Sequence, residues 1–262
     1  RPAEVEDAIV LPAKACESHR EAARELRKYL TRITGRGPAM KVFLERGPDE
    51  LGTDGFRLTV KNGGRLDAKL YGFYNSQTLI VGEGSVFSNR NDAGTGEYFF
   101  QPRVDISNTV FTVADGGRLE NIGRFRLRGK NNRLVFSGAK TDQTLFHDGG
   151  FSMVEAANEL SVEAGAKLRI RKSDGTKHNN NRIRLYGDII VTGAGSLLFF
   201  DTAGIMVAGG PNVAGGSNIT VADGARFDLG GGVNLAADGG TNACSRLDIA
   251  TNAAVCLEGM LA

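Results

Sequence analysis

The sequence predicts a mainly β protein, a right-handed parallel β-helix that follows a small N-terminal α/β or helical cap. Three observations lead to this fold class: a nine-residue motif recurs, two further short strands accompany its copies, and glycine is concentrated where the motif occurs. Of the 36 glycines, 7 lie in residues 1–69 and 29 in residues 70–262. We therefore expect an N-terminal segment over residues 1–69 and a repeat domain over residues 70–262.

The motif is clearest at Ile219–Phe227, where the template is apolar, any, apolar, any, any, Gly, small, any, apolar. Strand alternation would turn Ile219 and Val221 inward. Glycine or asparagine at the sixth position marks a sharp turn, because both tolerate left-handed backbone angles. Further copies begin at Leu79, Phe111, Leu160, Ile189 and Leu247, and a degenerate copy begins at Leu134. Their turn positions span 168 residues in six steps, a mean period of 28: Gly84, Gly116, Ala139, Gly165, Ala194, Gly224 and Asn252.

Two more strands are expected in each repeat. One follows the turn, with inward pairs at Leu168 and Ile170, Leu197 and Phe199, Phe227 and Leu229, and Val255 and Leu257. The other precedes the motif, at Phe125–Leu127, Phe151–Met153, Ile183–Leu185 and Val233–Leu235. Three strands and three turns per repeat are the layout of one coil of a parallel β-helix. A β-sandwich is the competing fold, but hairpins do not demand a turn glycine at a fixed long period.

The N-terminal segment predicts a strand at Ala8–Pro12 and then an amphipathic helix. Ser18 and Glu21 form a capping box, and an apolar stripe follows at helical spacing. The stripe consists of Ala22, Leu26, Tyr29, Leu30 and Ile33. Strands are expected after the helix at Met40–Leu44 and Gly55–Val60. This segment would cover the first coil, whose strand edges are otherwise open.

Two resemblances accompany these patterns. Residues 8–62 contain AIVLP, EAARELRKYLTRITG and LGTDGFRLTVKNG, and they resemble the N-terminal α/β accessory domain of bacterial glycoside hydrolases of the α-glucuronidase type. In that family the catalytic residues lie in a following barrel domain, so the resemblance implies carbohydrate-related ancestry and transfers no catalytic residue. Residues 70–262 resemble bacterial surface and autotransporter-associated β-helix repeats, which serve as stalks, adhesins or enzyme scaffolds.

Catalytic motifs are weak in this sequence. Asp115, Asp223 and Asp238 adjoin turn glycines, where turn chemistry explains them, and no aspartate cluster recurs at one coil position as a calcium site would require. His147-Asp148 is followed by two glycines and is interpreted as a surface turn. We therefore expect no catalytic residue, no metal site and no cofactor. A polysaccharide lyase or glycoside hydrolase on the outer face of the β-helix remains the alternative.

Location and covalent state are only loosely constrained by the sequence. Cys16, Cys244 and Cys256 give no disulfide framework, although a Cys244–Cys256 bridge would form if these positions met on neighbouring strands. No run of 18 apolar residues predicts a transmembrane segment. The chain opens on Arg1-Pro2 and stops in mid-pattern at Ala262, so we expect a mature form or a piece of a longer protein, extracellular or at the cell surface.

Charge is distributed unevenly along the repeats. Residues 124–184 carry 13 basic and 6 acidic side chains, whereas residues 185–262 carry 2 and 7. This basic belt predicts a site for an acidic polysaccharide through Arg–carboxylate pairs, while an ordinary solvated exterior is the simpler explanation. Nucleic acid is not expected, because aromatic residues are not interleaved with these arginines. The candidate residues are Arg124, Arg126, Arg128, Arg169, Arg171, Arg182 and Arg184.

The function expected from the sequence is therefore that of a noncatalytic exported or cell-surface scaffold that binds acidic polysaccharide through the belt. Net charge of +2 gives no whole-chain argument for nucleic acid or membrane surfaces.

Overall fold

The computed structural model describes residues 41–43, 57–68, 72–89, 103–121, 124–127, 130–146, 151–153, 157–171, 184–201, 206–208, 217–231, 233–234 and 246–257. All regular secondary structure in these ranges is β. β1 (Lys41–Phe43) and β2 (Arg57–Lys61) confirm the two strands predicted in the N-terminal segment. The strand predicted at Ala8–Pro12 and the helix that follows it lie outside the described residues.

The strands form four sheets. A nine-stranded sheet contains, in spatial order, β1, β2, β5 (Gln77–Val81), β8 (Val110–Ala114), β11 (Arg133–Ser137), β14 (Glu159–Glu163), β17 (Asp188–Thr192), β20 (Asn218–Ala222) and β23 (Arg246–Ile249). A seven-stranded sheet contains β4 (Gly72–Tyr74), β7 (Arg103–Ser107), β10 (Arg124–Leu127), β13 (Phe151–Met153), β16 (Arg184–Leu185), β19 (Met206–Ala208) and β22 (Val233–Asn234).

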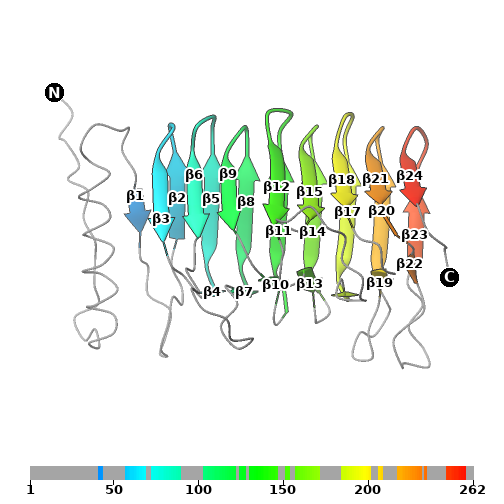
Figure 1. The fold of residues 1–262 in the computed structure, drawn as a ribbon, viewed down its shortest axis with the longest axis horizontal. Helices are drawn as coiled ribbons and strands as arrows, with labels where there is room; N and C mark the ends of the chain where they lie inside the picture. The colour runs from blue at the N-terminus through cyan, green and yellow to red at the C-terminus, as the bar shows by residue number, and fades with distance from the viewer. Residues whose placement is uncertain are drawn as a thin grey trace.

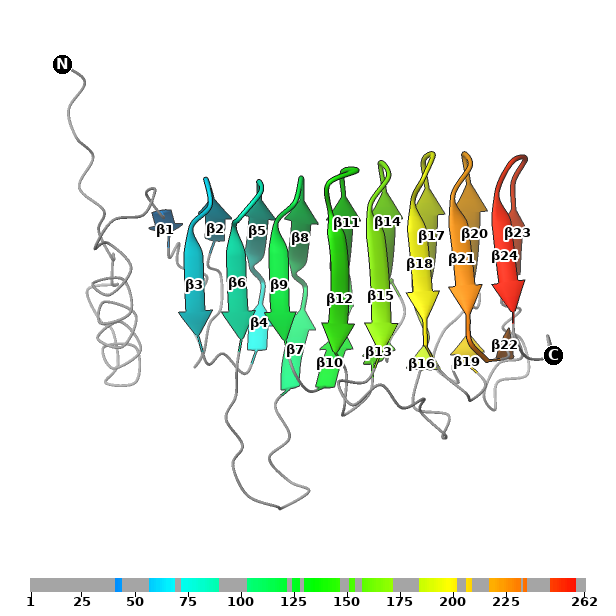
Figure 2. The ribbon, with the colours of Figure 1, turned by 45° about the horizontal axis from the view of Figure 1, so that its top comes forward.

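The remaining strands lie opposite the nine-stranded sheet in two separate sheets (Figure 2). A three-stranded sheet contains β3 (Arg65–Ala68), β6 (Val86–Asn89) and β9 (Arg118–Asn121). A five-stranded sheet contains β12 (Asp142–Phe146), β15 (Lys167–Arg171), β18 (Leu197–Phe200), β21 (Arg226–Leu229) and β24 (Ala254–Leu257).

The chain visits these sheets in a fixed order, and we call one such passage a circuit. Each circuit supplies a strand to the nine-stranded sheet, then to the three- or five-stranded sheet, then to the seven-stranded sheet. Among the described strands every pairing is parallel except that of β1 with β2. Stacked circuits make an elongated molecule with β1 near one end and β23 and β24 at the other (Figure 1). This parallel, stacked arrangement is compatible with the predicted β-helix, and it begins at β2, ahead of residue 70.

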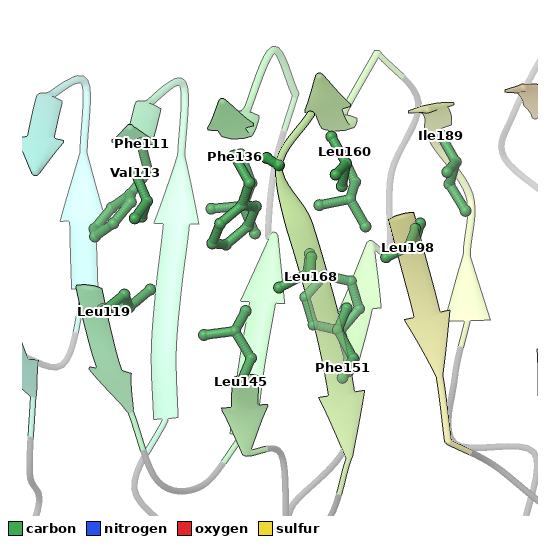
Figure 3. Close-up of a cluster of buried hydrophobic side chains, with 14 of the residues drawn as sticks. Phe111, Val113, Leu119, Phe136, Leu145, Phe151, Leu160, Leu168, Ile189 and Leu198 are labelled. Carbon is green, nitrogen blue, oxygen red and sulfur yellow. The ribbon is translucent and has the colours of Figure 1, made fainter. Parts of the chain in front are cut away.

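A single apolar core runs between the sheets. In the nine-stranded sheet one inward register line is apolar in every parallel strand: Val60, Ile80, Val113, Phe136, Val162, Val191, Val221 and Ile249. All of these except Ile249, in the last circuit, are completely buried. Across the core they face the strands of the opposite sheets, as Figure 3 shows for Phe136 and Leu145. Ile219 and Val221 point inward, as predicted.

The turns that leave the nine-stranded sheet are of two kinds. Tight turns have three residues between the strands and two successive left-handed residues, such as Asp115 (φ 50°) and Gly116 (φ 89°). The tight turns are Asn62–Gly64, Asp115–Gly117, Ala164–Ala166 and Asp223–Ala225. Long turns have four residues and are Gly82–Ser85, Gly138–Thr141 and Gly193–Ser196. The two kinds alternate from Asn62–Gly64 to Asp223–Ala225, so these circuits repeat in pairs. The turn after β23, Ala250–Ala253, breaks the alternation, because it leaves Val255 in register with Phe227 as a second tight turn would.

The extra residue of the long turns corrects part of the predicted register. Leu198 and Phe200 are completely buried, whereas Leu197 and Phe199, predicted inward, are partly exposed. One added residue moves every following side chain to the other face of a strand. The prediction that Ala139 and Ala194 occupy the left-handed position of their turns was also wrong. The left-handed residues of these two turns are Gly138, Gly193 and Gly195. In the copy at Leu79 the inward residues are Thr78 and Ile80, and Leu79 is 37% exposed.

Each long turn ends in a buried hydroxyl that joins two circuits. The Ser196 hydroxyl donates to the Thr192 carbonyl oxygen (2.7 Å) and accepts from the Gly165 N–H of the preceding tight turn (2.8 Å). Ser85 makes the same pair of bonds with Val81 and Gly63, and Thr141 makes it with Ser137 and Gly116. These hydroxyls satisfy backbone groups that burial would otherwise leave unpaired.

Side chains also complete the hydrogen bonding elsewhere between circuits. At the turns that enter the nine-stranded sheet, Asn132 Oδ1 accepts from Thr109 N–H (3.1 Å), and Asn158 Oδ1 accepts from Asn132 N–H (3.0 Å). Between β9 and β12, where the opposite side divides into two sheets, the buried Gln143 amide accepts from Leu119 N–H (2.8 Å) and donates to the Leu119 carbonyl oxygen (2.9 Å). A polar residue in an otherwise apolar inward line therefore bridges the break.

Candidate functional site

Part of the predicted belt lies on the seven-stranded sheet. Arg124 and Arg126 belong to β10 and Arg184 belongs to β16. Parallel pairing puts Arg126, Ser152 and Arg184 on one register line across three neighbouring strands, as expected for matching strands two circuits apart. Arg128 and Arg182 lie outside the described residues.

The rest of the belt lies on β15, in the five-stranded sheet. Lys167, Arg169 and Arg171 alternate with the completely buried Leu168 and Ile170, so all three basic side chains are on the outer face of this strand. The predicted residues therefore occupy two sheets.

Apolar side chains flank β15 on both neighbouring strands. Phe146 of β12 pairs with Arg171, Leu197 of β18 pairs with Lys167, and Phe199 pairs with Arg169. These three apolar residues are on the outer face and partly exposed. Both β12 and β18 follow long turns, and the added turn residue accounts for their outward aromatic rings. We call this surface the β15 face and define it by Phe146, Lys167, Arg169, Arg171, Leu197, Phe199, Arg226 and Asp228.

Carboxylates partly neutralise the β15 face. Arg169 pairs with Asp142 of β12, and Arg226 Nε donates to Asp228 Oδ1 (2.7 Å). The hydrogen bond from Arg226 and the charge of Asp228 raise the pKa of the Arg226 guanidinium above its usual value. Lys167 has no ion-pair partner among the described residues, and the buried Nε of Arg171 has no hydrogen-bond partner there. The face therefore keeps one exposed cation without an ion-pair partner in the described ranges, Lys167, beside apolar surface.

A regular row of cations passes through this face, and the sequence reasoning missed it. Arg65, Arg118, Lys167 and Arg226 share one outer register line and occur on every second strand. The Gln143–Leu119 bonds continue the line across the break between the two sheets. The signal was present as a triplet after each tight turn: a basic residue, an apolar residue and a charged residue. The strands after long turns lack this triplet. A template built from single repeats treats both kinds of strand alike and therefore does not detect it.

Over the three-stranded sheet, the two cations of this row, Arg65 and Arg118, both interact with Glu120. Its carboxylate accepts from Arg65 Nη2 (2.9 Å), two strands away, and lies 3.7 Å from Arg118 Nη2. Burial disfavours the charged form of Glu120, but hydrogen bonds from Arg65 and Ser88 and the two guanidinium charges outweigh it. The pKa of Glu120 consequently lies below its ordinary value.

Other candidate groups add little to the site. In the described part of the chain no three His, Cys, Asp or Glu side chains come together as a metal site. Cys256 is an exposed free thiol, so a Cys244–Cys256 disulfide is absent, while Cys16 and Cys244 lie outside the described ranges. His147-Asp148 lies outside them as well. No helix in the described ranges is long and apolar enough to cross a membrane.

Comparison with known proteins gives no match: no protein family, no curated protein and no solved structure is significantly similar to this chain.

Proposed function

We propose that this protein is a noncatalytic β-helix scaffold that binds acidic polysaccharide through its basic belt. The observation that carries the proposal is the register line of Arg126, Ser152 and Arg184, together with the three outward basic residues of β15. Arg126 and Arg184, 58 residues apart in the sequence, share a register line with one strand between them, and the other three basic residues lie on a single strand of a second sheet. Arginine at such positions suits carboxylate recognition, because its planar fork can donate two parallel hydrogen bonds.

The proposal includes finer features of the fold. The circuits wind as a right-handed β-helix with a coil of about 28 residues, although partner spacing varies from Val60–Ile80 to the much longer Ile80–Val113 step. Right-handed winding is the general rule for parallel strands joined by crossovers. We place the protein outside the cell or at its surface, in keeping with the resemblance of residues 70–262 to surface β-helix repeats and of residues 8–62 to a glycoside hydrolase accessory domain.

Retention on an immobilised polyuronate column tests this function. The wild-type chain is expected to bind at low salt and to elute as salt screens the arginine–carboxylate attraction. The double variant Arg126→Glu, Arg184→Glu should lose this salt-sensitive retention. A matched control is Arg57→Glu, Arg246→Glu, which changes the same number of charges on the nine-stranded sheet and should bind normally.

Two results would overturn the proposal. Unchanged retention of the Arg126→Glu, Arg184→Glu variant would show that the belt does not bind the polysaccharide. Release of unsaturated sugar from the column material, with or without added calcium, would establish the lyase alternative in place of a noncatalytic scaffold.

A further inference from the structure

We infer that the β15 face is the polysaccharide subsite, and that its ligand is a linear polysaccharide of low charge density with one carboxylate on every second sugar. This inference rests on the proposed function and specifies its ligand class. It follows from three properties of the described residues: outward apolar rings beside cations, near-neutral net charge, and a two-strand spacing of the cations.

The apolar surface is the first property. Phe146 and Phe199 sit on the outer side of a sheet, on the two strands that flank β15. Aromatic rings that stay partly exposed on a sheet are suited to the apolar faces of sugar rings, while neighbouring polar groups bind the hydroxyls. Leu197, paired with Lys167, extends this apolar surface along β18. Flanking aromatic residues on both sides of Arg169 and Arg171 distinguish this face from an ordinary charged exterior.

The charge balance is the second property. Four cations, Lys167, Arg169, Arg171 and Arg226, lie on or beside the face together with three carboxylates. Asp142 pairs with Arg169, Asp228 pairs with Arg226, and Asp201 follows β18 with its N–H bonded to the Ile170 carbonyl oxygen of β15. Such a surface gains less from each added charge of a ligand than a strongly basic surface would, so a charge on every unit brings little advantage. Nucleic acid binding depends mainly on neutralising closely spaced phosphates, so a nearly balanced face is poorly suited to it. Carboxylates that accept from sugar hydroxyls and cations that bind occasional acids instead fit a sparsely charged polysaccharide.

The spacing is the third property. Lys167 and Arg226 lie on the same register line two strands apart, with Leu197 between them. Neighbouring strands are about 4.8 Å apart, so these cations are separated by roughly 9.6 Å along the stack. A polysaccharide laid along the stack covers a comparable length with two sugars. One sugar would then lie over Leu197 and Phe199, while the acids of its neighbours reach Lys167 and Arg226.

Isothermal titration with hyaluronan oligosaccharides, which carry one carboxylate per disaccharide, tests the inference. Polygalacturonate oligosaccharides, with an acid on every sugar, and single-stranded DNA serve as comparison ligands. Hyaluronan should bind most tightly to the wild-type chain. Phe199→Ala should weaken it about tenfold, the order expected for loss of one aromatic contact. Lys167→Gln with Arg226→Gln should weaken it and reduce its salt dependence.

Matched variants separate this inference from the proposed function. Leu79→Ala removes an exposed apolar side chain from the nine-stranded sheet and should leave binding unchanged, and urea unfolding verifies that each variant is folded. If Arg126→Glu, Arg184→Glu abolishes binding but Phe199→Ala and the Lys167, Arg226 variant do not, the β15 face is not the subsite although the proposed function stands. Tighter binding of polygalacturonate or DNA than of hyaluronan overturns the ligand class. A wild-type chain that binds no acidic polysaccharide overturns the proposed function itself.

Discussion

The nine-stranded sheet and the opposite side of the molecule are built from the same chain passages, but they differ in regularity. The nine-stranded sheet is unbroken and keeps one inward apolar line through all its parallel strands. The opposite side divides between β9 and β12, and the side chains that face the core shift by one residue after each long turn. The turns lie between the two sides, so turn length decides the difference. The outward rings of the β15 face result from this shift.

The largest expected effect tests the shifted register directly. Phe200→Ala empties a completely buried position on β18 and should lower the free energy of unfolding by about 3–5 kcal/mol. Phe199→Ala, one residue earlier on the outer face, should cost less than about 1 kcal/mol. Urea denaturation of the two variants gives the comparison, and a larger loss at Phe199 would restore the register of the simple template.

The break between the three-stranded and the five-stranded sheet provides the next test. Gln143→Leu makes the inward line apolar throughout but leaves the Leu119 N–H and carbonyl oxygen without the amide. Because unpaired buried backbone groups are costly, the variant should be less stable by about 2 kcal/mol despite its added apolar surface. Thr144→Val, on the outer face of the same strand, is the control for thermal melting. Equal or greater stability of Gln143→Leu would mean that the amide bonds are dispensable.

The buried hydroxyl of a long turn should have a smaller effect. Ser196→Ala leaves the Gly165 N–H without its acceptor and should cost about 1–2 kcal/mol in urea unfolding. Ser196→Thr should be nearly neutral, because Thr141 fills the equivalent position in another long turn. Similar destabilisation by both variants would point to crowding at the turn and not to the lost hydrogen bond.

The smallest effect concerns the pH dependence of the ion pairs over the three-stranded sheet. The pKa of Glu120 is lowered in the folded state, so its contribution is present above the unfolded carboxyl pKa and is lost as pH falls through the folded pKa. The exposure of Arg65, 42% for its side chain, limits the gain to less than about 1 kcal/mol. Melting temperatures from neutral pH to about pH 3 should fall slightly less for Glu120→Gln than for the wild type. An identical fall for both proteins would show that Glu120 contributes nothing.

Prediction of the inward residues succeeded in most strands before the turns and failed after the long turns. It also failed before one long turn, in the copy at Leu79, where Thr78 and Ile80 face inward. The motif placed Ile219 and Val221 inward because strand alternation needs no knowledge of loop length. It misplaced Leu197 and Phe199, since a fixed template cannot detect the residue added in Gly193–Ser196. Leu197, Leu198, Phe199 and Phe200 are all apolar, so hydrophobic pattern gives no register there. Only turn geometry resolves it.

The candidate site was found only in part for the same reason. Local charge counts located Arg169 and Arg171, but they could not show which residues neighbour them across strands. Phe146 is 25 residues from its partner Arg171, and Phe199 is 30 from Arg169. These contacts depend on the stacking register of successive circuits. The cation row at Lys167 and Arg226 was missed because it recurs every second circuit, twice the period of the template.

Several side-chain acceptors that bond the backbone of one circuit come from the circuit that follows it, which bears on folding during synthesis. The N–H groups of Gly63, Gly116 and Gly165 each bond to a hydroxyl supplied by the following circuit, and Leu119 likewise awaits Gln143. A nascent chain that has made only the earlier circuit therefore ends in unfinished hydrogen bonding, which the next stretch to emerge completes. For a chain that folds as it is synthesised, we expect each new passage to complete the hydrogen bonds of the passage before it.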